Sequence, residues 1–78
     1  MTLDFCNVQY VTCLFNDATE GFAALELNAT SEGESRQIGR ITFWDAAGQF
    51  YIEMTGPEIP LEVLEKFIVE AKRVIQTS

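Results

Sequence analysis

The last clear segment of the chain, residues 60–76, carries the pattern that most restricts its fold. Apolar residues recur there at steps of three and four positions: Leu61, Leu64, Phe67, Ile68, Ala71, Val74 and Ile75. This spacing gathers them on one side of an α-helix. Such a stripe has to be covered, and the chain before it has the composition of short strands. The sequence therefore predicts one sheet with one helix laid across it.

Four segments before this helix are predicted to be β-strands, at residues 5–15, 22–30, 36–44 and 49–55. The first is rich in β-branched and aromatic residues and contains neither Gly nor Pro, which favours a strand. The second alternates between apolar and other residues, as a half-buried strand does. Turn-forming stretches, NDATEG and SEGES, separate the first three strands. The predicted fold class is α+β: a four-stranded antiparallel meander with one C-terminal helix packed on one face, ββββα in two layers.

The stretch DAAG between the last two strands predicts their register. We expect a four-residue hairpin loop with Gly48 in the left-handed region. Phe43 then faces Phe50 on one side of the sheet, and Arg40 and Glu53 form an ion pair on the other. A shift of one residue would invert every contact. The core face predicted beneath the helix has Leu25 and Leu27 beside the following residues: Ile41, Phe43, Phe50, Ile52 and Met54.

The chain is short and acidic. Its 78 residues carry 12 acidic and 5 basic side chains, for a net charge of -7. This length allows one core, so residues 1–78 are predicted to form a single domain. An acidic surface repels phosphate backbones and anionic lipids, which disfavours direct binding to nucleic acid or membranes. The same charge would attract a basic protein surface, or it serves only to keep a small protein in solution.

Targeting signals and cysteines indicate the compartment. No segment approaches the roughly 18 apolar residues of a membrane-spanning helix, and the first residues lack the basic start of a signal peptide. In one strand, Cys6 and Cys13 would lie on opposite faces and roughly 23 Å apart. A disulfide needs Cα atoms within about 7 Å. Free thiols fit a reducing compartment, so we expect a cytoplasmic protein.

The residue types of common enzyme sites are missing or badly spaced. The chain has no histidine, which removes the usual general base and the commonest zinc ligand. Two cysteines on opposite faces do not make a thiolate metal site. The glycines form neither a phosphate-binding loop nor a dinucleotide motif, and there is no nucleophile elbow. The sequence therefore predicts a protein that is not an enzyme and that needs no cofactor or metal.

The sheet face turned away from the helix is the candidate functional surface. One helix covers one face, so the other exposes large apolar side chains among charges, more than a monomer usually shows. Aromatic residues beside arginine are also typical of interface hot spots. The other interpretation is that each aromatic ring is half-buried under a loop. The candidate interface residues are Val11, Phe15, Phe22, Arg40, Trp44, Tyr51 and Glu53.

Two hypotheses of function follow. The first is a small non-enzymatic protein-interaction domain, whose partner is a second copy of itself or another protein. In the homodimer, two such faces pack across a two-fold axis. The alternative is an acidic inhibitor or decoy, of the phage anti-defence type, that blocks a basic nucleic-acid-binding surface on a target protein. A decoy requires one contiguous patch made by Asp17, Glu20, Glu26, Glu32 and Glu34.

Overall fold

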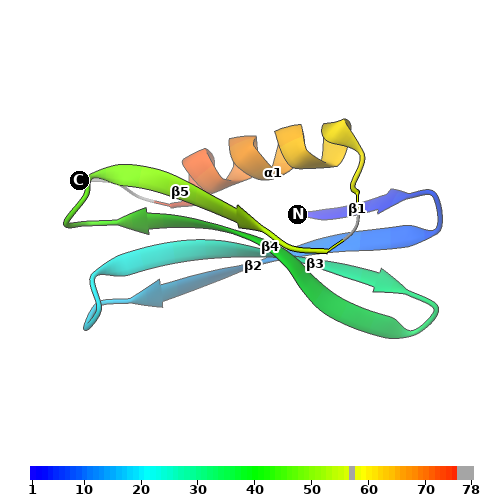
Figure 1. Ribbon diagram of the computed structural model, residues 1–78, viewed down its shortest axis with the longest axis horizontal. Helices are drawn as coiled ribbons and strands as arrows, with labels where there is room; N and C mark the ends of the chain where they lie inside the picture. The colour runs from blue at the N-terminus through cyan, green and yellow to red at the C-terminus, as the bar shows by residue number, and fades with distance from the viewer. Residues whose placement is uncertain (57, 76–78) are drawn as a thin grey trace.

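The computed structural model describes residues 1–56 and 58–75, in five strands and one helix. The elements are β1 (Thr2–Phe5), β2 (Val8–Asp17), β3 (Phe22–Ser31), β4 (Glu34–Trp44), β5 (Gln49–Met54) and α1 (Leu61–Val74). The strands form one antiparallel sheet in chain order, with α1 across one face (Figure 1). The α+β two-layer meander is confirmed, with five strands rather than four. Residue 76 of the predicted helix lies outside the described residues.

The segment predicted as the first strand, residues 5–15, contains the end of β1, a tight turn and most of β2. Cys6 and Asn7 have φ angles of 51° and 66°, and Phe5 pairs directly with Val8. Two successive left-handed residues between paired strands make the tight hairpin turn that matches strand twist. Its usual sequence signal ends in glycine, so Cys-Asn does not reveal it. Cys6 therefore lies in a turn and Cys13 in β2, and both thiols are free and exposed.

The predicted register of the last two strands is confirmed. Gly48 has a φ of 64°, and Phe43 pairs with Phe50. The two rings meet edge to face, with centroids 5.0 Å apart. Arg40 also pairs with Glu53 along the backbone, but the predicted ion pair is wrong. In the part of the chain that the structure describes, the ion pairs within 4.0 Å both involve another residue, Glu70.

The core lies between α1 and the middle strands. Its buried members are Tyr10, Leu25, Leu27, Ile38, Ile41, Val63, Phe67, Ala71 and Ile75. Within the helix, Val63, Phe67 and Ala71 face the sheet, whereas Leu61 at the first position is exposed. The predicted helix stripe is therefore wrong at Leu61, and Val63 takes its place. A β-bulge opposite Leu27 and Asn28 shifts the β3–β4 register and leaves Ile38 buried.

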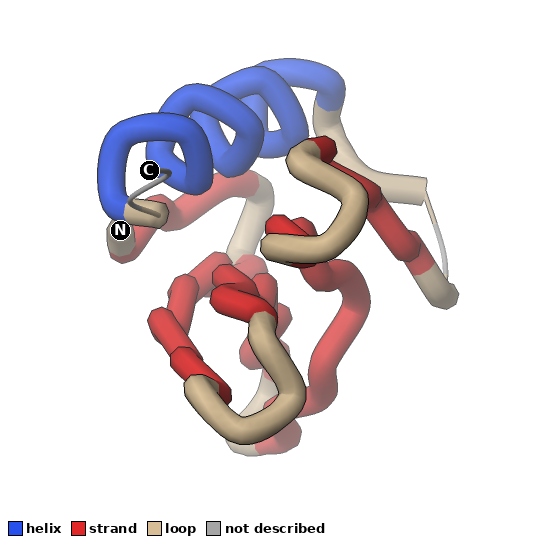
Figure 2. The backbone as a smooth tube through the Cα atoms, turned by 90° about the vertical axis from the view of Figure 1, so that its left-hand side faces the viewer, coloured by secondary structure: helices blue, strands red, loops and turns tan. Residues whose placement is uncertain are grey.

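Two residues predicted for the core are not buried. Ile52 and Met54 remain 50% and 38% exposed. Both belong to β5, which lies at the edge of the sheet, while α1 packs over β2 and β3. Viewed from the end, the helix covers one side of the strands only (Figure 2). The prediction was wrong because alternation assigns a residue to a face of the sheet but does not say how far the helix reaches across that face.

Candidate protein-interaction face

We call the side of the sheet that faces away from α1 the open face. Opposed residues of antiparallel strands point to the same side, and the observed registers link the candidate residues in rows. Phe15, Ala24, Thr42 and Tyr51 form one row, and Phe22 opposes Trp44. A further row runs through Cys13, Glu26, Arg40 and Glu53, and Val11 opposes Asn28. All seven candidate interface residues therefore lie on this one face.

Three rings form a contiguous aromatic cluster, made of Phe15, Phe22 and Trp44. The centroids of Phe22 and Trp44 are 4.8 Å apart, and those of Phe15 and Phe22 are 5.7 Å apart. Aromatic pairs at such separations attract one another beyond simple area burial. Phe15 and Trp44 nevertheless keep 44% and 39% of their surface exposed. The rings are thus half-buried against one another and leave a continuous apolar surface.

Small residues lie between these rings and the middle of the face. Ala24 is 0% exposed and Thr42 is 8% exposed, although α1 lies on the opposite side. Ala24 is flanked by Phe22 along its own strand and by Phe15 across the ladder. The large side chains of the open face thus shield the backbone beneath them, as a partial second core layer would.

Arg40 gives this apolar surface a charge. Its guanidinium carbon lies 5.3 Å from the centroid of the Phe22 ring, a cation–π distance. The Nε atom is buried and has no hydrogen-bond partner among the described residues. Glu26 and Glu53 are its cross-strand neighbours, yet neither pairs with it within 4.0 Å. The open face therefore holds a cation with an unused donor between two carboxylates.

A hollow of about 640 Å³ lies beside Arg40 on the open face, with Glu20, Trp44, Tyr51 and Glu53 in its lining. Its walls combine aromatic rings with charges of both signs, a lining that suits a protein side chain entering from outside. In the described ranges, no group of three or more Cys, Asp or Glu residues is placed to hold a metal ion. No described helix is long and apolar enough to cross a membrane.

The acidic residues of the first half do not form one patch. Glu32 lies in the β3–β4 turn and Glu34 begins β4, whereas Asp17 and Glu20 lie at the β2–β3 turn, at the other end of the molecule (Figure 1). That molecule is 38 Å long. The Asp17 carboxylate also accepts hydrogen bonds from the backbone of Thr19 and Glu20, both at 3.0 Å, so it shapes its own turn.

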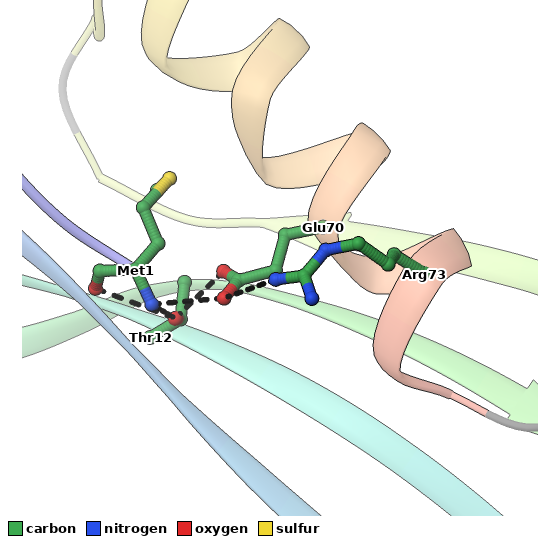
Figure 3. A network of polar contacts seen from close by, with 4 residues as sticks. All are labelled: Met1, Thr12, Glu70 and Arg73. Carbon is green, nitrogen blue, oxygen red and sulfur yellow. Dashed lines mark hydrogen bonds and ion pairs between the residues drawn. The ribbon is translucent and has the colours of Figure 1, made fainter.

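A polar network that sequence reasoning missed lies on the helix side. The amino group of Met1 donates to Thr12 Oγ1 at 2.7 Å and to Glu70 Oε2 at 2.8 Å, and the Thr12 hydroxyl donates to Glu70 Oε1 at 2.8 Å (Figure 3). Arg73 adds a longer ion pair at 3.9 Å. Burial alone would raise the pKa of Glu70, but these hydrogen bonds and positive charges outweigh it and hold the pKa below its usual value.

This network has a structural role. It joins the residue before β1 to β2 and α1, and it keeps the Glu70 carboxylate ionised and occupied by donors. No local sequence motif predicts the network, because its three hydrogen-bonded members, Met1, Thr12 and Glu70, are 11 to 69 residues apart.

Comparison of the chain with family models, with curated proteins and with solved structures finds no match. The function therefore has to be inferred from the surfaces of the molecule.

Proposed function

We propose that this chain is a small non-enzymatic protein-interaction domain that forms a homodimer through its open face. The observation that carries this proposal is the aromatic cluster of Phe15, Phe22 and Trp44, which stays partly exposed beside the unused donor of Arg40. Exposed aromatic residues next to arginine are the composition in which binding energy concentrates. A partner would bury the rings and complete the layer that they begin.

The dimensions of the open face support a stable contact. Four strands at about 4.8 Å spacing, over some eight residues at about 3.3 Å each, span roughly 500 Å² of flat area. The relief of the side chains increases the accessible surface beyond that figure. A typical specific interface buries about 800 Å² per partner, so one open face, with its relief counted, approaches the area that each partner supplies.

A second copy is the partner that the charges favour. In a two-fold dimer the same patch meets itself, so every contact is made twice. Arg40 of one copy can then approach Glu26 or Glu53 of the other, which would pair its guanidinium group with a carboxylate. An acidic face of this kind is unsuited to nucleic acid, because phosphates would meet the glutamates.

Sedimentation of matched variants tests the proposal. Trp44→Glu places a charge in the aromatic cluster and should halve the mass of the wild-type assembly while the fold, followed by circular dichroism, is retained. Val69→Glu is the control, because Val69 is 66% exposed on α1 and should leave the mass unchanged. A wild-type protein of 8.8 kDa at every concentration would contradict the proposal.

The acidic-decoy hypothesis has less support. It requires one contiguous acidic patch, and Glu32 and Glu34 lie at the opposite end of the sheet from Asp17 and Glu20. Strong salt dependence of binding to a basic target would favour it. A dimer held by apolar burial would instead survive added salt.

We also propose a cytoplasmic location. Cys6 and Cys13 are free and exposed, a state that a reducing compartment maintains. In an oxidising compartment, exposed thiols of two copies would cross-link. A disulfide-linked dimer on a non-reducing gel of the protein taken from its native cells would contradict this location.

A further inference from the structure

The strand β5 is an unprotected edge of the sheet. It is the last strand in the order, and five of its six residues are exposed. Natural edge strands are usually shielded by proline, by lysine or by covering elements. β5 contains neither residue type, and its one charge, Glu53, points to the open face. The other edge strand, β1, is shorter, and the residue before it is bonded to the helix through Glu70.

The backbone of β5 offers its outer hydrogen-bonding groups in a regular order. The N–H of Thr55 donates inward to the carbonyl of Ile38 at 2.9 Å. In an antiparallel pair, residues bond to the neighbouring strand alternately. Gln49, Tyr51 and Glu53 therefore share the inward orientation of Thr55. The N–H and C=O groups of the remaining three residues point outward, away from β4: Phe50, Ile52 and Met54.

We infer that β5 is a strand-pairing edge, at which a second copy of this chain adds its own β5 in antiparallel orientation. A two-fold axis at Ile52 opposes Ile52 to itself, and Phe50 to Met54 of the second copy. These are the residues whose backbone groups point outward, so each opposed pair exchanges two hydrogen bonds. The result is one sheet that continues across two molecules, with both helices on the same side.

The side chains favour this register over its neighbours. On the helix side it brings together the apolar residues Phe50, Ile52 and Met54 of both copies. On the open face, Tyr51 lies opposite Glu53 of the second copy, where its hydroxyl can donate to the carboxylate. A shift that centres the axis on Glu53 would oppose two like charges, which is unfavourable. The edge is therefore complementary to itself in backbone, apolar surface and charge.

A hollow beside β5 receives the added strand. It measures about 170 Å³ and lies between the edge and the helix, with Ile41, Ile52, Ile68 and Lys72 among its lining residues. Ile52 is exposed here although it faces the helix side. An apolar side chain from the second β5 fits this position and would cover Ile52.

Mass measurements on paired variants test the edge separately from the open face. Trp44→Glu breaks the open-face contact but leaves the β5 contact, so this variant should still contain two copies. Adding Ile52→Lys to it should reduce the assembly to one copy. Adding Thr2→Lys, the same charge on the exposed edge strand β1, should change nothing. Equal masses with and without Ile52→Lys would overturn the inference. A different result would contradict the open-face proposal. In protein that carries Ile52→Lys, the mass would then be the same with and without Trp44→Glu.

Amide hydrogen exchange gives a second readout, in which the inward amides of β5 report whether each variant stays folded. At millimolar concentration, the amides of Phe50, Ile52 and Met54 should be protected in Trp44→Glu protein. They should exchange freely when Ile52→Lys is added, while the inward amides of Tyr51 and Glu53 stay protected in both. If the three outward amides exchange freely at every concentration, no second copy pairs there and the inference is wrong.

Discussion

The two faces of this sheet are made by the same strands, yet their apolar side chains are buried to different degrees. Beneath α1, Leu25, Leu27 and Ile41 are buried in a closed core. On the open face, Phe15 and Trp44 shield small residues but remain partly in water. The alternation of side chains along a strand thus produces one complete apolar layer and one incomplete layer. A substitution on the first should unfold the molecule, and one on the second should separate its copies.

The largest effect is expected on the covered face. Phe67 is fully buried at the centre of the α1 contact. Phe67→Ala should lower the free energy of unfolding by about 3–5 kcal/mol, because it leaves a cavity as well as losing apolar contacts. Urea denaturation measures this change. Val69→Ala on the exposed side of the helix is the control, and an equal loss in both variants would contradict the contrast between the faces.

A smaller effect, and one on a different quantity, is expected on the open face. Phe22 contacts both Phe15 and Trp44 and lies beneath Arg40. Phe22→Glu should weaken the homodimer by about 2 kcal/mol or more, the range of an interface hot spot. Analytical ultracentrifugation in an Ile52→Lys background isolates this contact. Phe22→Leu keeps an apolar side chain and should weaken the dimer less; equal affinities of all three proteins would contradict the prediction.

The polar network on the covered side should contribute less than the core. Glu70→Gln removes the negative charge that binds the Met1 amino group at 2.8 Å, and it should lower the free energy of unfolding by about 1–3 kcal/mol. Thermal unfolding at neutral pH measures the loss. Glu65→Gln, on an exposed position of the same helix, is the matched control and should change stability little.

The same carboxylate makes stability depend on pH. The pKa of Glu70 is lower in the folded protein than its ordinary value of 4.5. Its contribution is therefore complete above that ordinary value and is lost as the pH falls through the lowered pKa. Glu70→Gln should remove this part of the acid sensitivity. If the wild-type and Glu70→Gln proteins lose stability in parallel as the pH falls below 4.5, Glu70 is not the source of this pH dependence.

The smallest effect is expected at the turn that places β1 beside the core. Cys6 has a φ of 51°, which is unfavourable for most side chains but tolerated by asparagine. Cys6→Asn should raise the free energy of unfolding by a few tenths of a kcal/mol to about 1 kcal/mol. Denaturant titration under reducing conditions measures it. A loss of stability would show that the thiol makes a favourable contact.

The sequence predicted what local chemistry determines. Gly48 and the facing Phe43 and Phe50 set the β4–β5 register, because only one alignment pairs apolar side chains. The turn at Cys6 and Asn7 escaped prediction, because cysteine does not signal a left-handed residue. Both outcomes, the correct register and the missed turn, depend on residues that are close together in the sequence.

Positions that depend on tertiary placement were harder to predict. Ile52 and Met54 face the correct side but lie beyond the reach of α1. Arg40 lies over the ring of Phe22 at 5.3 Å and does not pair with Glu53. The alternation of residues along the strands was enough to predict which side chains share the candidate face. It was not enough to predict which contacts those side chains make.

The bond between Met1 and Glu70 has a consequence for the order of folding. The hairpins of a meander join residues close in sequence and can form early. Met1 and Glu70 are 69 residues apart, so their contact requires closure of nearly the whole chain. During synthesis Met1 is made before Glu70, so this contact cannot form until α1 has been made. Met1 is thus among the last residues to reach its native contacts.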